Sequence, residues 1–283
     1  MAAASKVSDL HRTAFVTGAS TGLGRAFAEM LLAEGVRVWG TSRDIGRLAP
    51  LTAAHPDMFT PVAFELGDTA RIDAVWAMAE RAASGFDLVI NNAGYGVFAE
   101  FAATEFKVWE DQLQVMLVNT ARVSHLALRG MRARNRGALV NLSSLAAEFP
   151  LPFQSAYNVC KAGLTALNES LMEEFAGSGV IIIDMRPGDY RTDFETSVRR
   201  PASAASSPSA PRLQRAWAAF ETMMQGGPPP EHAAAALRGA LLANRSRTLR
   251  TGRFFQAVVA PFISRFGSLA LKRRIQARYF DIH

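Results

Sequence analysis

Six short segments of this chain are almost wholly apolar, and segments with helical periodicity separate them. The apolar segments are TAFVTG (13–18), VRVWGTS (36–42), FTPVAFEL (59–66), FDLVINNAG (86–94), GALVNLSS (137–144) and GVIIIDMRPG (179–188). A strand that is apolar on both faces must be covered by helices on both sides. The alternation therefore predicts an α/β fold, a Rossmann-type doubly wound parallel sheet.

The length of 283 residues and the hydrophobic content of 49% suit one large domain spanning 1–283. The alternation of strands and helices is interrupted at 189–230, where RRPASAASSPSAPR precedes a helical stretch and GGPPP. A spacer between two domains is the alternative, but too little chain follows for a second domain. We therefore expect a helical substrate lid at 189–230 and a C-terminal extension at 253–283.

Targeting and metal signals are weak. The chain contains no run of eighteen uncharged apolar residues, and its first residues lack the apolar core of a signal peptide, so a cytoplasmic location is expected. A single cysteine, Cys160, excludes an internal disulfide, and the five histidines show no metal-ligand spacing. No metal site is predicted.

The net charge of +6 and the pI near 10.0 bear on partners. The basic residues are mostly spread along the chain, with one cluster in LKRRIQAR (271–278), and no aromatic-studded platform for nucleic acid accompanies them. We expect no nucleic-acid partner. A modest basic excess also suits an anionic cofactor or a membrane surface.

The segment TGASTGLG (17–24) lies between the first strand and the first helix. Its glycines would let backbone amides and the helix N-terminus approach a phosphate, whereas a turn that merely needs positive φ is the alternative. Because the segment lies between a predicted strand and a predicted helix, we predict a dinucleotide site. Its loop residues are Gly18, Ser20, Thr21, Gly22, Leu23 and Gly24.

The end of the second strand bears on the choice of cofactor. Dinucleotide folds commonly place an acid there for the ribose hydroxyl, whereas an arginine accommodates a 2′-phosphate. The residues are Ser42 and Arg43, and Arg43 offers a planar fork of donors. NADP is therefore predicted over NAD. In the alternative, Arg43 is a surface residue and Asp44 binds the ribose or caps the following helix.

The segment SAYNVCKAGL (155–164) places Tyr157 four residues before Lys161, one turn apart on a predicted helix. A chance pair on a solvated face is the simple interpretation. A phenol beside an ammonium is also the pair that acid–base chemistry needs.

Several motifs in order make the chain similar to the short-chain dehydrogenase/reductase family, from about Thr13 to Thr192. They are TGASTGLG, NNAG (91–94), Asn119 in LVNTA, the serines of NLSS, YNVCK and RPGDYRT. The resemblance implies that Tyr157 is the general acid or base. Lys161 would lower the pKa of Tyr157 and hold the nicotinamide ribose.

The resemblance also implies the remaining site residues. Ser144, thirteen residues before Tyr157, would hydrogen-bond the substrate carbonyl, with Ser143 as the fallback, and Asn119 would anchor a water on the proton path. A helix-interior polar residue satisfied locally is the alternative for Asn119. Further cofactor contacts would come from Glu65, Leu66, Asn92, Ala93, Gly94, Pro187, Gly188, Tyr190 and Thr192, besides Tyr157 and Lys161.

The predicted function is NADP(H)-dependent hydride transfer between the nicotinamide and an apolar carbonyl or alcohol substrate. An apolar wall is expected from the residues just before Tyr157, those after NNAG and those in the lid: Leu151, Pro152, Phe153, Tyr95, Val97, Phe98, Trp217, Phe220, Met223 and Met224. The pattern is similar to that of the steroid and retinol branch of the family, and core positions are the alternative for most of these residues. An epimerase or dehydratase with retained cofactor, or a catalytically silent NADP-binding regulator, are the alternatives. The resemblance implies a homodimer or homotetramer. The C-terminal tail is expected to pack on its own domain or close a dimer, with contact to a membrane surface as the alternative.

Overall fold

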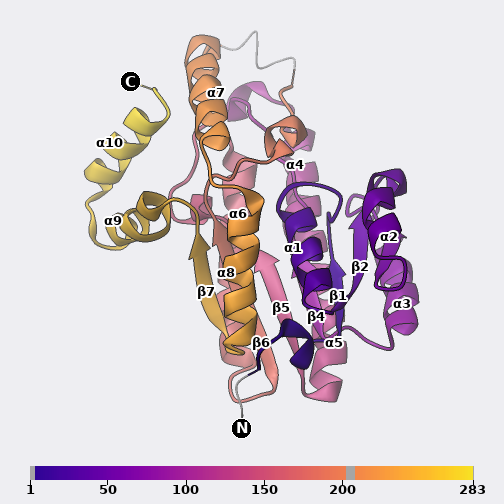
Figure 1. Cartoon of the computed structure of the whole chain (residues 1–283). Coiled ribbons are helices and arrows are strands. Elements are labelled where there is room, and N and C mark those ends of the chain that lie inside the picture. The colour runs from indigo at the N-terminus through magenta and orange to yellow at the C-terminus, as the bar shows by residue number, and fades with distance from the viewer. Residues whose placement is uncertain (1–3, 202–207, 283) are drawn as a thin grey trace.

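The computed structural model describes residues 4–201 and 208–282. Within them, one seven-stranded parallel sheet has the order β3-β2-β1-β4-β5-β6-β7, as predicted for a doubly wound fold (Figure 1). The strands are β1 (Thr13–Val16), β2 (Arg37–Ser42), β3 (Phe59–Ala63), β4 (Leu88–Asn91), β5 (Gly137–Leu142), β6 (Val180–Pro187) and β7 (Arg247–Thr251).

Helices connect the strands and cover both faces of the sheet (Figure 1). The α-helices of the described residues are α1 (Gly22–Ala33), α2 (Ala49–Ala54), α3 (Ile72–Ala83), α4 (Phe106–Leu113), α5 (Thr120–Arg134), α6 (Ser155–Glu174), α7 (Ala210–Gln225), α8 (Pro230–Leu242), α9 (Ala260–Phe266) and α10 (Leu269–Tyr279), of which α9 and α10 follow the last strand. A π-helical turn, Gln114–Asn119, joins α4 to α5, so residues 106–134 form one continuous helical run.

The strands divide their side chains between two buried cores because successive residues point to opposite faces. Val16 and Ile90 face a core closed by α1 and α8, whereas Phe15 and Val89 face a core closed by α3, α5 and α6. Both faces of the sheet are therefore dry, which explains the nearly continuous apolar strands.

The winding reverses between β1 and β4, which are parallel neighbours although two strands separate them in sequence. Connections from β1 run toward one edge of the sheet, and connections from β4 run toward the other. Loops at the carboxyl ends of β1 and β4 therefore splay apart and leave a crevice, where ligands bind in open α/β sheets.

Strand β7 and helix α8 were not predicted from the sequence. The sequence of β7, RTLRT, has no apolar run because this edge strand pairs only with β6 and most of its residues are half-buried. Helix α8 is strongly apolar and packs on α1.

The predicted lid and the C-terminal extension meet in a third buried cluster. Trp217 and Phe220 from α7 pack with Phe98, from the loop after β4, and with Phe280 at the C-terminal end of α10. Residues 202–207 of the predicted lid lie outside the described residues. The extension thus packs on its own domain, one of the outcomes expected for it.

In the described part of the chain, no helix combines the length and apolar character needed to cross a bilayer.

Replacing Phe15 by alanine should strongly destabilise the fold. Phe15 is fully buried, and its ring centre lies 5.2 Å from those of Trp76 and Phe86 and 5.8 Å from that of Phe64. The resulting cavity should lower the free energy of unfolding by about 3–5 kcal/mol. Urea unfolding measures this. The matched control, exposed Phe101→Ala, should change it by about 0.5 kcal/mol or less, and equal losses would contradict this account of the core.

Candidate active site

A cavity of about 1190 Å³ lies at the carboxyl ends of the strands. It exceeds the usual range for a single small ligand. One end is lined by the loop Gly18–Leu23 and by Ser42 and Arg43, and the other end by Ser144, Tyr157 and Lys161. The structure thus brings the predicted phosphate loop and the predicted acid–base pair to one continuous space.

Gly24 is required where α1 approaches the end of β1. A Cβ atom at Gly24 would lie 2.1 Å from the Gly18 carbonyl oxygen and 2.3 Å from Asn92 Nδ2. Asn92 Nδ2 donates to the carbonyls of Thr17 (2.9 Å) and Gly18 (3.3 Å), tying the loop to the end of β4. Gly18 and Gly22 both have positive φ, so the turn and the close approach are both real requirements.

The cavity carries two arginines beyond the end of β2. Arg43, as predicted, and Arg47, which sequence reasoning missed, are exposed and line it together. Asp44 accepts a hydrogen bond from the Gly46 amide at 2.9 Å, so its side chain caps the next helical turn. Buried Ser42 donates to Ser20 Oγ at 3.4 Å and adds no charge. This end of the cavity suits an anion.

Tyr157 and Lys161 lie one turn apart on α6, with Lys161 Nζ 5.5 Å from the centre of the Tyr157 ring. Lys161 Nζ donates to the Leu142 carbonyl at 2.6 Å. Burial lowers the pKa of Lys161 to about 8. Burial also raises the pKa of Tyr157 to about 12, and hydrogen bonding by Ser144 only partly opposes this.

Among the protein side chains alone the net shift of the Tyr157 pKa is therefore upward, and the lowering expected from Lys161 stays a prediction. The desolvation of the phenolate outweighs the favourable interactions around it. At neutral pH Tyr157 is protonated and available as a proton donor.

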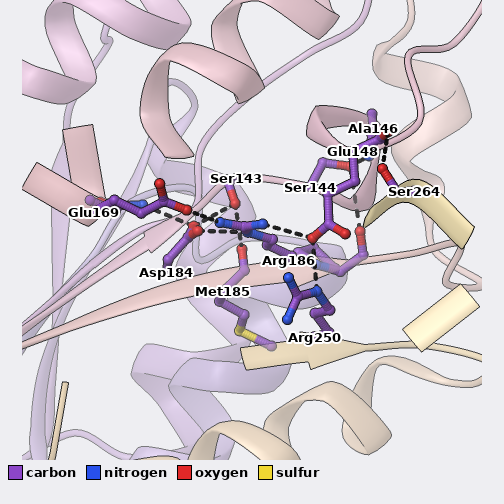
Figure 2. Close-up of polar contacts among 12 residues, drawn as sticks. Ser143, Ser144, Ala146, Glu148, Glu169, Asp184, Met185, Arg186, Arg250 and Ser264 are labelled. Carbon is purple, nitrogen blue, oxygen red and sulfur yellow. Dashed lines mark hydrogen bonds and ion pairs between the residues drawn. The ribbon is translucent and has the colours of Figure 1, made fainter. Parts of the chain in front are cut away.

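The two serines after β5 have different surroundings. Ser143 Oγ donates to Asp184 Oδ1 at 2.5 Å and lies 3.3 Å from the Met185 carbonyl (Figure 2). Ser144 Oγ accepts from the Ala146 amide at 3.0 Å and makes a long contact of 3.4 Å with the Pro187 carbonyl. Because Ser143 is held by a buried carboxylate, Ser144 is the better placed of the two for a ligand.

An ion-pair network centred on the buried side chain of Arg186 lies beside these serines (Figure 2). Arg186 pairs with Asp184 and Glu148, both at 2.7 Å, and with Glu169 at 2.9 Å. Asp184 is fully buried and Arg186 nearly so. Arg250 from β7 also reaches Glu148, at 2.8 Å, so the network joins β6, α6, β7 and the loop after Ser144.

The Asn119 side chain is buried at the end of the π-helical turn. Its Nδ2 donates to the Leu66 carbonyl at 2.5 Å and to Thr69 Oγ1 at 3.0 Å, and its Oδ1 accepts from Gln114 Nε2 at 2.9 Å. These contacts match the local-satisfaction alternative and direct the side chain toward the loop after β3. Its part in a proton path stays a prediction.

The other predicted cofactor contacts are brought to the same cavity. Thr192 lies against the phosphate loop, since a Cβ at Gly22 would be 3.4 Å from it, and it caps the next turn through Phe194. Tyr190 is buried with its hydroxyl 2.9 Å from His232 Nδ1. The cavity lining also includes Glu65, Leu66, Asn92, Ala93, Gly94, Pro187 and Gly188.

Sequence reasoning missed several polar groups in the cavity. Gln256 and Tyr279 of the C-terminal extension both hydrogen-bond Asp189, Tyr279 at 2.8 Å. Gln154 is buried beside Tyr157, and among the described residues neither polar atom of its amide has a partner. Only its place three residues before Tyr157 could have drawn attention to it.

The apolar wall expected from the sequence is partly correct. Tyr95, Leu151, Phe220 and Met224 line the cavity. By contrast, Val97, Phe98 and Trp217 do not line the cavity and pack only within the third buried cluster, to which Phe220 and Met224 also belong. Phe194 joins the wall, its ring centre 6.1 Å from that of Tyr157.

The model of the short chain dehydrogenase family matches residues 12–203. The chain belongs to this family. The matched region includes the glycine loop, both serines, Tyr157 and Lys161, and it ends before α7. This short-chain dehydrogenase is accordingly an oxidoreductase with the predicted Rossmann-type fold.

Relatives and solved structures agree with the assignment. A probable NADP-dependent dehydrogenase of Haemophilus influenzae is 33% identical over 178 residues, 62% of this chain and 70% of the relative. A short-chain dehydrogenase from Streptomyces avermitilis is 29% identical, with a TM-score of 0.76 over 96% of each chain. A family member from Burkholderia phymatum in complex with NAD shares the fold at 21% identity, with a TM-score of 0.74 over 97% of this chain and 96% of that one.

Substituting Gly24 by alanine should weaken dinucleotide binding. The added methyl group would overlap the Gly18 carbonyl and displace Asn92, opening the loop. We expect the NADPH dissociation constant to rise tenfold or more, about 1.4 kcal/mol, as measured by fluorescence titration. The matched control is Gly239→Ala in α8, where a Cβ meets nothing within 4 Å and binding should be unchanged. Equal affinity in Gly24→Ala would refute this account of the loop.

Proposed function

We propose that this short-chain dehydrogenase transfers hydride between NADP(H) and an apolar carbonyl or alcohol substrate. One observation carries the proposal: a single cavity holds a glycine loop and two arginines at one end and Ser144, Tyr157 and Lys161 at the other. The glycine loop would hold the phosphates of a dinucleotide, and Tyr157 and Lys161 would lie at its nicotinamide end.

The residues of the cavity fit NADP. The N-terminus of α1 and the backbone of Gly18–Leu23 would hold the pyrophosphate, and Arg43 and Arg47 would bind a 2′-phosphate beside neutral Ser42. When bound, the cofactor supplies the hydride. The relative from Haemophilus influenzae, whose name includes NADP dependence, supports the same choice.

The chain's own residues would complete the reduction by handling a proton. Tyr157, protonated at neutral pH, would donate its hydroxyl proton to the carbonyl oxygen as negative charge develops there. Ser144 Oγ would donate a second hydrogen bond to that oxygen. Lys161, charged below its pKa of about 8, would stabilise the phenolate that remains. In oxidation the same proton would move in reverse.

Substrate class follows from the walls around Tyr157. Leu151, Phe194, Phe220 and Met224 suit an apolar substrate. Gln154, with an unpartnered buried amide, would bind one further polar group on it. Residues 189–230 would act as the substrate lid, because α7 contributes Phe220 and Met224 to the cavity.

The two alternatives, an epimerase or dehydratase with retained cofactor and a silent regulator, receive no specific support from the site. Ser144, Tyr157 and Lys161, the residues expected to act on the substrate and the proton, are all present and line the cavity. A homodimer or homotetramer remains a prediction from the family resemblance.

The cofactor assignment is tested by Arg43→Ala. Loss of the guanidinium should reduce the preference for NADPH over NADH, expressed as the ratio of kcat/KM values, by about tenfold or more, because a charge-assisted hydrogen bond contributes about 1.5–3 kcal/mol. Arg47→Ala should produce a smaller loss in the same direction. Arg71→Ala on the exposed surface is the control. An unchanged ratio in Arg43→Ala would exclude this role.

The proposed reaction is tested by Tyr157→Phe, which removes the proton donor and keeps the ring. NADPH oxidation at 340 nm against apolar aldehydes, ketones and quinones should fall by a factor of about 100 or more. NADPH binding should stay within about twofold, because the hydroxyl acts on the substrate oxygen. Wild-type turnover that persists in the variant would overturn the assignment of Tyr157, and tight NADPH binding without any turnover would favour the regulator.

A further inference from the structure

The C-terminal extension exposes an unusual amount of apolar surface. Seven of the thirteen exposed large hydrophobic side chains in the described residues lie between 254 and 271: Phe254, Phe255, Val258, Phe262, Phe266, Leu269 and Leu271. Phe254, Phe262 and Phe266 are 74%, 66% and 67% exposed. Single exposed hydrophobic residues are ordinary, but a contiguous group on one short segment marks an interaction surface.

These side chains form one face rather than a scatter. Phe254, Val258, Phe262 and Phe266 recur every four residues along the π-helical turn Phe255–Val259 and α9, which follow each other without a break. Residues four apart share one face of a helix. The rings of Phe262 and Phe266 lie 4.9 Å apart between centres. We call this row the aromatic ridge.

Basic residues accompany the aromatic ridge. The segment from 253 to 280 contains six lysines and arginines and no acidic residue. Arg265, Arg273, Arg274 and Arg278 are exposed, and within residues 4–201 and 208–282 none of them is paired with a carboxylate. Arg265 stacks against the ring of Phe266. The segment therefore combines an apolar face with uncompensated positive charge.

Neighbouring positions on the same segment line the cavity. Phe255, Ala260 and Pro261 line it next to the aromatic ridge, and Ile275 and Tyr279 line it from α10. Figure 1 shows α9 and α10 outside the β7 edge, beside the carboxyl ends of the strands. A small molecule released from a surface that touches the aromatic ridge would therefore lie beside the cavity.

We propose that the aromatic ridge and the basic residues of α9 and α10 dock this protein on the surface of an anionic lipid bilayer. Phenylalanines insert at the headgroup boundary while arginines bind lipid phosphates, the pattern of an interfacial helix. The helices lie on the membrane and do not span it. Docking there would deliver apolar substrates to the cavity, and this second statement rests on the proposed function.

Charge distinguishes lipid from the other occupants of such a face. In a two-fold contact with a second copy of this chain, like surface meets like, and the arginines of α9 and α10 would oppose each other without acidic partners. Nucleic acid would satisfy the arginines but would leave the row of phenylalanines in water. An anionic bilayer provides both negative charge and an apolar layer.

Binding to lipid vesicles tests the proposal on the full chain with NADPH bound. Sedimentation with vesicles of phosphatidylcholine and phosphatidylserine should pull down wild type, and vesicles of phosphatidylcholine alone should bind it far less. Arg273→Ala/Arg274→Ala should weaken partition by about 30-fold, because each basic residue near the surface contributes on the order of 1 kcal/mol. Phe262→Ser/Phe266→Ser should weaken it tenfold or more. Raising the salt concentration should also release the protein.

The control is Phe101→Ser, an equally simple loss of an exposed phenylalanine (56%) far from α9 in sequence, which should bind vesicles like wild type. All variants should retain the wild-type melting temperature and NADPH affinity, which separates loss of docking from misfolding. Catalysis is not the readout, so the test is independent of the proposed reaction.

Two outcomes would overturn the proposal. One is wild type that ignores phosphatidylserine vesicles at low salt, or Phe262→Ser/Phe266→Ser that binds them undiminished. The other is a change in the oligomeric state of Phe262→Ser/Phe266→Ser by light scattering with vesicle binding unaltered, which would make the ridge a contact between copies of this chain.

Discussion

Reversal of the winding between β1 and β4 determines where the cavity of this protein lies. A parallel sheet must be covered on both faces, so successive crossovers pass to opposite sides on either side of this point. The loops that follow β1 and β4 therefore diverge and leave a crevice. Strands β1, β4, β5 and β6 end beside this crevice. The glycine loop, Asn92, Ser144 and Pro187 meet there because of where their strands end, although they are scattered through the sequence.

Two sets of buried polar contacts fix the loops that line this crevice. The Asn92 amide holds the glycine loop against β4, and the Asp184–Arg186 pair holds the loop that carries Ser143 and Ser144. A buried ion pair is costly to break, about 3–5 kcal/mol when one partner is lost, because a charge is then left without compensation. The pair therefore fixes Ser143, whose hydroxyl donates to Asp184. It also links this serine to β7 through Glu148 and Arg250.

The fold could be predicted from the sequence wherever a pattern is local. Six apolar strands, the glycine loop and the spacing of Tyr157 and Lys161 are readable because each depends on neighbours in the chain. The edge strand β7 could not be predicted, since it is half-buried and RTLRT has no apolar run. Arg47 and Gln154 were also missed, because only the path of the chain brings them to the cavity.

The sequence by itself determined the parallel sheet and was enough to predict the dinucleotide loop and the Tyr157–Lys161 pair, because hydrophobic period, glycine placement and the order of short motifs are local properties of the chain. Only the tertiary structure decided the electrostatics. Burial raises the pKa of Tyr157 against the expectation from Lys161 alone, and Ser143 is held by Asp184, forty-one residues away. It also decided that some residues of the C-terminal segment line the cavity while neighbouring ones are exposed, since burial depends on what packs alongside.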